Sequence, residues 1–135
     1  MNRDTYVKHH EEIRELMNTI EKLIKERQPE KNADSIARNV AVLAGKVSVH
    51  LSLEDKYLYP KLAESTEEKI RSLAIRYQKQ MGGIASNFVI YKDKYNTKPE
   101  VLEGAAKIEK ETEVMFKELR NRIEKEEQEL YQYIG

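Results

Sequence analysis

Apolar residues recur at steps of three and four positions along almost the whole chain, and this period limits the fold more than any other feature. Side chains at that spacing line one face of an α-helix. Turn and capping residues divide the pattern into helical stretches at about residues 4–27, 34–62, 68–95 and 97–134. Long amphipathic helices with short connections favour antiparallel neighbours. The sequence therefore predicts an all-α fold, an antiparallel up-down-up-down four-helix bundle that forms one domain over residues 1–135.

The boundaries of these stretches carry local signals. Pro29 is expected to stop the first helix, and Asn32 or Asp34 to cap the second. Ser65-Thr66-Glu67-Glu68 has the form of a capping box before the third helix. Thr97-Lys98-Pro99-Glu100 combines a cap with an early proline before the fourth.

Gly82-Gly83 interrupts the third stretch, at a helix-propensity cost of about 1 kcal/mol per glycine. One interpretation is a close helix–helix contact or a tolerated weak point. The other is a local kink that opens a path to the core beside Met81.

Composition limits the function classes. Lys and Arg number 24, as do Asp and Glu, so the net charge is zero and no one-signed field attracts nucleic acid or an anionic membrane. The absence of cysteine excludes disulfides, thiolate metal ligands and iron–sulfur clusters. The charged first residues and the short apolar runs predict neither a signal peptide nor a membrane span. A cytoplasmic protein is expected.

The seam of the second stretch turns polar at His50 and Glu54, one helical turn apart on the same face. Burying these groups costs several kcal/mol unless they are paired or bound to a cation. The first seam turns polar at His10, and the fourth at Arg122 and Glu126. A rise of about 1.5 Å per residue places all of these positions at one level of the bundle. We therefore expect a polar layer inside the core.

The layer suits one divalent or trivalent metal ion with nitrogen and oxygen ligands, such as iron, manganese or zinc. Its candidate ligands are His10, His50, Glu54 and Glu126. The alternative is a metal-free network in which Arg122 pairs with both carboxylates and the histidines form hydrogen bonds.

Further side chains border the layer. Tyr77 and Met81 face it from the third stretch, and Tyr77 is either a phenolate ligand to ferric iron or a core tyrosine bonded to a layer glutamate. His9 points about 100° away from the seam and is expected to be solvated, although it remains an alternative to His10 as ligand. Tyr59 and Tyr131 are expected to pack the end of the bundle.

Three segments now carry a family resemblance: His10-Glu11-Glu12-Ile13, the run His50-x-x-x-Glu54-Asp55-x-x-Leu58-Tyr59-Pro60, and residues 122–131. Together they resemble the hemerythrin-like, or HHE cation-binding, family of four-helix bundles, which hold a non-haem di-iron centre. The resemblance covers essentially the whole chain. Residues 122–131 also repeat the second-helix run weakly, with Arg122 where the family has histidine.

In that family each iron takes its imidazoles mainly from one pair of helices, and two carboxylates bridge the irons. The resemblance implies that the ligands of one iron are kept, together with both bridging acids. Tyr77, Met81 and Arg122 stand where the histidines of the other iron are expected. We therefore expect at most one bound ion, with iron favoured, and Arg122 as a built-in cation in place of the second.

The resulting prediction is a hemerythrin-like metal-binding protein with a mononuclear site, in which O₂ carriage by paired irons is not expected. Two alternatives stay open. One is a metal-free interaction or signalling module, and the other a small metalloenzyme that acts on O₂, peroxide or NO. The metal ion, and in the last case a small diatomic ligand, are the expected partners. No catalytic residue and no nucleic-acid or membrane partner is predicted, and nothing identifies a protein partner.

Overall fold

The predicted apolar seams are the buried faces of helices. The computed structural model describes residues 3–134, and every regular element in that range is helical, which confirms the predicted all-α fold. The long helices are α1 (Arg3–Lys25), α2 (Pro29–Leu53), α4 (Glu68–Tyr95) and α6 (Ile108–Lys125). The shorter elements are η1 (Glu54–Leu58), α3 (Tyr59–Ala63), α5 (Lys98–Glu103), η2 (Glu126–Leu130) and η3 (Tyr131–Tyr133).

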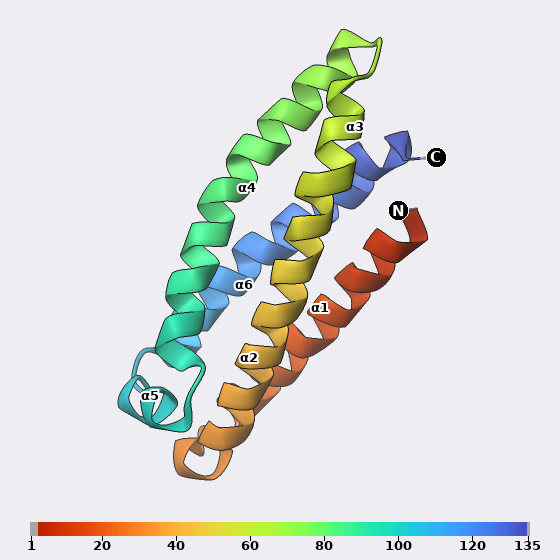
Figure 1. Cartoon of the computed structure of the whole chain (residues 1–135). Coiled ribbons are helices and arrows are strands. Elements are labelled where there is room, and N and C mark those ends of the chain that lie inside the picture. The colour runs from red at the N-terminus through yellow and green to blue at the C-terminus, as the bar shows by residue number, and fades with distance from the viewer. Residues whose placement is uncertain (1–2, 135) are drawn as a thin grey trace.

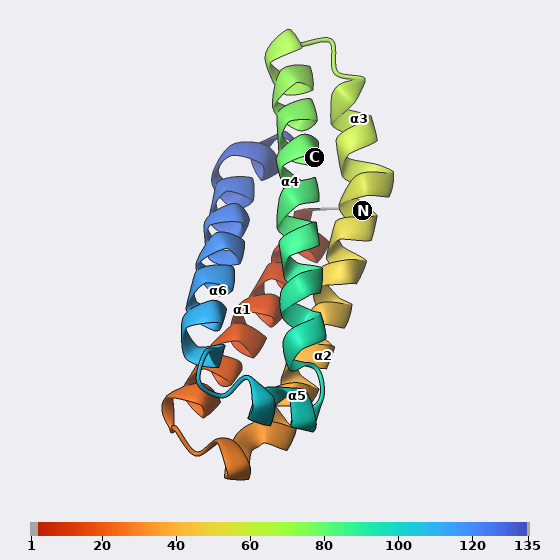
Figure 2. The same ribbon diagram turned by 90° about the vertical axis from the view of Figure 1, so that its left-hand side faces the viewer.

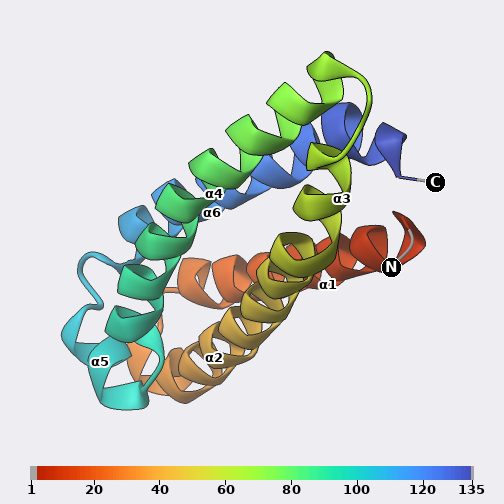
Figure 3. The ribbon, with the colours of Figure 1, turned by 45° about the horizontal axis from the view of Figure 1, so that its top comes forward.

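The long helices pack side by side around a shared core. Helix α1 contacts α2 and α6, and α4 contacts the same two helices (Figures 1 and 3). The short helix α5 lies at one end, against α2 and α4 (Figure 2). Elements η1 and α3 extend α2, while η2 and η3 extend α6 toward the end where both termini lie.

The core consists of two apolar clusters with polar residues between them. The larger cluster runs along the long helices, and the smaller one fills the end near the termini. On α1, buried His10 lies between Tyr6 of the smaller cluster and Ile13 of the larger one. The polar layer therefore interrupts the core between the two clusters. Within residues 3–134, no helix has both the length and the apolar character that crossing a membrane would need.

The first helix ends before Pro29, as expected, but Pro29 itself begins α2, so the predicted start of the second helix at about residue 34 was wrong. A proline fits the first turn because its missing N–H has no partner in the helix there. Neither Asn32 nor Asp34 is the cap. Instead, the side chain of Asn32 is buried and donates hydrogen bonds to the Leu23 carbonyl and the Glu26 carboxylate, which tie α2 to the end of α1.

The fourth predicted helix is two helices. Thr97 caps α5 as expected, since its hydroxyl accepts a hydrogen bond from the Glu100 N–H at 3.4 Å. The helix then ends at Gly104, and α6 begins at Ile108. A Cβ atom at Gly104 would stand 2.7 Å from a ring carbon of Tyr95, so the close approach of these segments requires glycine.

Gly82 and Gly83 do not break α4, which continues through both. They face solvent, and a Cβ atom at either would meet no atom within 4 Å. They therefore mark no close helix contact, and α4 is not interrupted beside Met81; of the two interpretations, a tolerated weak point is the part that agrees with the structure. Before α4, Ser65 accepts a hydrogen bond from the Glu67 N–H, but the helix itself begins only at Glu68.

Candidate metal centre

Two π-helical turns start at the two buried glutamates. Element η1 begins at Glu54 and η2 at Glu126, where the sequence predicted unbroken α-helix. The N–H of Tyr59 donates to the carbonyl of Glu54, five positions earlier, and the N–H of Tyr131 donates in the same way to Glu126. Single π turns inside helices often occur at functional sites.

The wide turns change which side chains share a face. In an α-helix, residues five apart differ by about 140° around the axis, which would turn the tyrosines away from the glutamates. The i→i+5 hydrogen bond of a π turn brings such positions onto nearly the same face. As a result, both hydroxyls lie against carboxylates: Tyr131 donates to Glu54 at 3.0 Å, and Tyr59 donates to Glu126 at 3.2 Å. Both tyrosines pack in the smaller apolar cluster at the bundle end, as expected, but their contacts with the carboxylates were not predicted.

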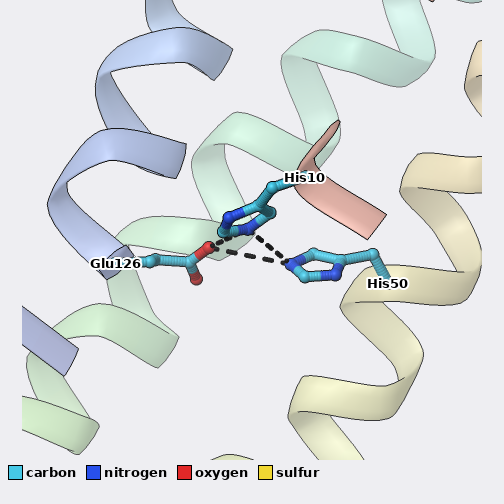
Figure 4. Close-up of side chains that lie close together, drawn as sticks. All are labelled: His10, His50 and Glu126. Atoms are coloured by element: carbon cyan, nitrogen blue, oxygen red, sulfur yellow. Dashed lines mark hydrogen bonds and ion pairs between the residues drawn. The ribbon is translucent and has the colours of Figure 1, made fainter. Parts of the chain in front are cut away.

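Figure 4 shows His10, His50 and Glu126 pointing toward one another from α1, α2 and the start of η2. His10 Nε2 lies 3.0 Å from His50 Nε2 and 3.1 Å from Glu126 Oε1. His50 Nε2 lies 3.7 Å from the same Glu126 oxygen and 3.4 Å from Glu54 Oε2. All four side chains are buried, so the structure brings the candidate ligands together in one dry cluster.

The orientation of His10 is fixed by a residue that the sequence analysis did not select. Its Nδ1 lies 2.9 Å from Glu127 Oε2, and Arg14 donates two hydrogen bonds to the same carboxylate. A neutral imidazole that donates Nδ1–H to Glu127 presents the lone pair of Nε2 to the cluster. Metal-bound histidines usually have such a carboxylate behind them. The only sequence signal was the place of Glu127, directly after Glu126.

Arg122 occupies the other side of the carboxylate pair. Its Nη2 donates to the Tyr59 hydroxyl at 3.0 Å and to the Tyr77 carbonyl at 2.7 Å, and its guanidinium carbon lies 4.2 Å from the centroid of the Tyr77 ring. Its Nε is 3.5 Å from Glu126 Oε2. The sequence predicted a pairing with both glutamates. Among the ion pairs of residues 3–134, Arg122 reaches Glu126 but not Glu54, which instead contacts His50 and Tyr131.

Tyr77 is buried, but its hydroxyl points along α6 rather than into the cluster. It donates to the Glu129 carboxylate and, at 3.3 Å, to the Lys125 carbonyl. The expected bond to Glu54 or Glu126 is therefore replaced by one to Glu129.

Two further candidates lie outside the cluster. Met81 is buried one helical turn beyond Tyr77. His9 is half-buried, and its Nδ1 lies 3.4 Å from His50 Nδ1, on the far side of that ring from the cluster. His9 is therefore less solvated than expected and contacts a candidate ligand from behind.

A family model, the hemerythrin HHE cation binding domain, matches residues 1–134. The chain belongs to this family. No curated protein and no solved structure matches it. The predicted relationship is confirmed, and within this hemerythrin domain the group of His10, His50 and Glu126 could hold a metal ion.

The protonation states of the buried histidines and glutamates in the cluster depend on one another. Burial and the nearby charge of Glu126 raise the pKa of Glu54 to about 8. Burial also acts to raise the pKa of Glu126, but hydrogen bonds from His10 and His50 outweigh it and the pKa falls below its ordinary value. Burial lowers the pKa of His50, yet attraction to both glutamates exceeds this and raises it to about 9. Without a metal ion, the cluster therefore holds protons at neutral pH in the place of a cation.

The residues present fit a metal ion. Neutral imidazole nitrogens and carboxylate oxygens are the ligands that iron, manganese and zinc take in proteins. In residues 3–134, Glu54 Oε1 is buried and accepts no hydrogen bond, although a buried carboxylate oxygen normally has a partner. His10 Nε2 faces His50, Glu126 and Tyr131 at 3.0–3.1 Å, and at most one of these contacts can use a proton on that nitrogen.

Proposed function

We propose that this hemerythrin domain binds one transition-metal ion, with iron favoured over zinc and manganese. The ligands are His10, His50, Glu54 and Glu126. The observation that carries the proposal is the convergence of His10, His50 and Glu126, whose ligand atoms lie within 4.8 Å of one another in the core. We further propose that the long helices form one antiparallel up-down-up-down bundle, in which facing helices supply the ligands.

Arg122 supports a mononuclear site. Its guanidinium lies beside Glu126 and stacks on Tyr77, where the family places the histidines of the other iron. A guanidinium is permanently charged, and a second metal ion at this distance would be repelled in a medium of low polarity. A bound iron ion would supply redox and Lewis-acid chemistry. We propose metal handling or sensing rather than O₂ carriage by two irons.

Metal titration tests the proposal. Chelator-treated protein is titrated with Fe²⁺ without air and, separately, with Zn²⁺, and the bound ions are counted by elemental analysis. We expect one ion per chain and a melting temperature that rises with the metal concentration, because an ion that binds only the folded chain stabilises it. His10→Ala and His50→Ala should lose the ion.

His9→Ala is the matched control, since His9 contacts His50 only from behind. It should retain one ion per chain. Two ions per wild-type chain would contradict the mononuclear site. Equal binding by wild type and His10→Ala would contradict the assigned ligands.

A metal-free interaction module is the second candidate. It is favoured by the observation that most polar atoms of the cluster already have partners: among the described residues, only Glu54 Oε1 and Arg122 Nε are buried without a hydrogen bond. This candidate predicts that neither Fe²⁺ nor Zn²⁺ changes the melting temperature. The same titration therefore decides between the two.

A further inference from the structure

The hydroxyl of Tyr131 lies in the middle of the candidate ligands. Its oxygen is 3.0 Å from His10 Nε2 and 3.3 Å from His50 Nε2, and it is 3.0 Å from Glu54 Oε2 and 3.5 Å from Glu126 Oε1. The side chain is fully buried. None of the ligands predicted from the sequence lies at this central position.

In the metal-free chain, hydrogen bonds satisfy only part of these contacts. A phenol carries one proton, so it can donate to only one of its four neighbours, while its oxygen can accept from an imidazole N–H. In this structure it donates to Glu54, and the remaining neighbours are two imidazole nitrogens and an oxygen of Glu126. Once the imidazoles carry no proton on Nε2, as binding of an ion requires, these atoms all present lone pairs to one dry site, which is how ligands are arranged around a cation.

The spacing fits a coordination sphere. Nitrogen and oxygen ligands lie about 2.0–2.2 Å from a metal ion, so neighbouring ligands of a tetrahedral or octahedral site are about 2.8–3.6 Å apart. The four distances from the Tyr131 oxygen all fall in this range. The His10–His50 and His10–Glu126 distances, 3.0 and 3.1 Å, do so as well.

Charge favours an additional anionic ligand. Arg122 already offsets Glu126, so Glu54 and Glu126 leave only one negative charge for an ion that carries two or three positive charges. Excess charge in a dry site is costly. Within residues 3–134, Tyr131 is the one uncharged acidic side chain that contacts both imidazoles, and its phenolate would cancel one positive charge.

The hydroxyls of two other tyrosines near the cluster already have hydrogen-bond partners. The Tyr59 hydroxyl accepts a hydrogen bond from Arg122 and donates one to Glu126. The Tyr77 hydroxyl is within hydrogen-bonding distance of the Glu129 carboxylate and of the Lys125 carbonyl. Neither hydroxyl forms a described hydrogen bond with a histidine. Tyr77 also forms none with Glu54 or Glu126 among the described residues, so it serves as the matched control.

We propose that Tyr131 is a metal ligand in this hemerythrin domain. Its hydroxyl releases a proton to water when the ion binds, and the phenolate oxygen coordinates the ion together with His10, His50 and the two glutamates. The inference rests on the metal site proposed above and adds a ligand to it. Coordination of ferric iron by a phenolate gives a charge-transfer band in the visible spectrum, which histidine and carboxylate ligands do not give.

The test loads chelator-treated protein with Fe³⁺ supplied as its nitrilotriacetate complex and removes the excess. Iron per chain and the visible spectrum are then measured. We expect one iron per chain and a visible band in the wild type. Tyr131→Phe should lose the band, whereas Tyr77→Phe should keep it.

The outcomes separate the two proposals. A wild-type chain that binds no iron overturns the metal site and the ligand with it. A wild-type chain with one iron but no visible band overturns only the Tyr131 ligand, as does a band that survives Tyr131→Phe. If circular dichroism shows that Tyr131→Phe is unfolded, resonance Raman of the wild type decides. Excitation within the band must then enhance tyrosinate ring vibrations, and their absence overturns the ligand.

Discussion

The two sides of the buried carboxylate pair have similar sequences but opposite chemistry. His50 precedes Glu54 by four residues, as Arg122 precedes Glu126, and each glutamate opens a π turn that ends before a tyrosine. On the histidine side, imidazole nitrogens and the Tyr131 hydroxyl converge. On the arginine side, a guanidinium supplies a permanent positive charge.

We interpret this difference as the effect of one residue, the one four positions before each glutamate, on whether that side of the carboxylate pair is left open for a metal ion. A histidine leaves room for a cation that comes from solution, whereas an arginine at the equivalent position provides the cation itself. The Arg122 guanidinium contacts Tyr59 and the Tyr77 carbonyl, so it is held by hydrogen bonds as well as by charge. The proposed single metal ion therefore belongs to the histidine side, and the arginine side holds a cation of the chain itself.

The largest effect should come from removing the built-in cation. Arg122→Met removes the permanent positive charge beside buried Glu126, and breaking a buried ion pair costs about 3–5 kcal/mol. Arg120→Met is the control, because Arg120 pairs with Glu21 at a partly exposed site, where such pairs contribute about 0–1 kcal/mol. Denaturant unfolding of the metal-free proteins measures both. Equal losses in the two variants would show that Arg122 has no special role.

A smaller effect should follow from changing the carboxylate behind His10. Glu127→Gln removes the charge that accepts from His10 Nδ1, and losing such a partner typically lowers metal affinity about 10–100-fold. Asp55 has the equivalent place after Glu54 but is exposed, so Asp55→Asn should leave the affinity unchanged. Competition with a chelator of known affinity measures both variants. An unchanged affinity in Glu127→Gln would mean that the Glu127 contact does not tune the ligand.

The most gradual effect concerns pH. The pKa of Glu54 is raised to about 8 and that of His50 to about 9, so the folded metal-free chain binds more protons than the unfolded chain above the ordinary pKa of each group. Its stability should therefore fall as the pH rises from 7 to 9, by at most about 1.4 kcal/mol per pH unit for each proton. Urea unfolding at pH 7, 8 and 9 measures the slope.

His50→Leu is the control for this slope, because it removes one of the two titrating groups. It should flatten the dependence on pH. Saturating Zn²⁺ should flatten it as well, because the ion takes the place of the protons. A metal-free wild type whose stability stays constant or rises over this range would contradict the assigned protonation.

Local periodicity explains which features of the fold could be predicted from the sequence. The three- and four-residue spacing gave the all-α fold, and it gave the buried faces because burial of one helix face depends only on positions along that helix. The same spacing put His10, His50, Glu54, Arg122 and Glu126 in the core, where the structure has them. The break of the fourth helix at Gly104 and the π turns at Glu54 and Glu126 were missed. The first depends on the approach of Tyr95, which no local pattern encodes.

The tertiary structure alone decided which groups touch within that layer. In an uninterrupted α-helix, Tyr59 and Tyr131 would point about 140° away from the glutamates. The π turns bring their hydroxyls to the carboxylates. The contacts of Glu127 with His10, and of Arg122 with Glu126 but not Glu54, depend on how α1 and α6 pack together. The sequence by itself thus determined which polar residues are buried, because burial follows the period of a single helix. Their partners were determined by packing, because hydrogen bonds between helices depend on distances that no single helix sets.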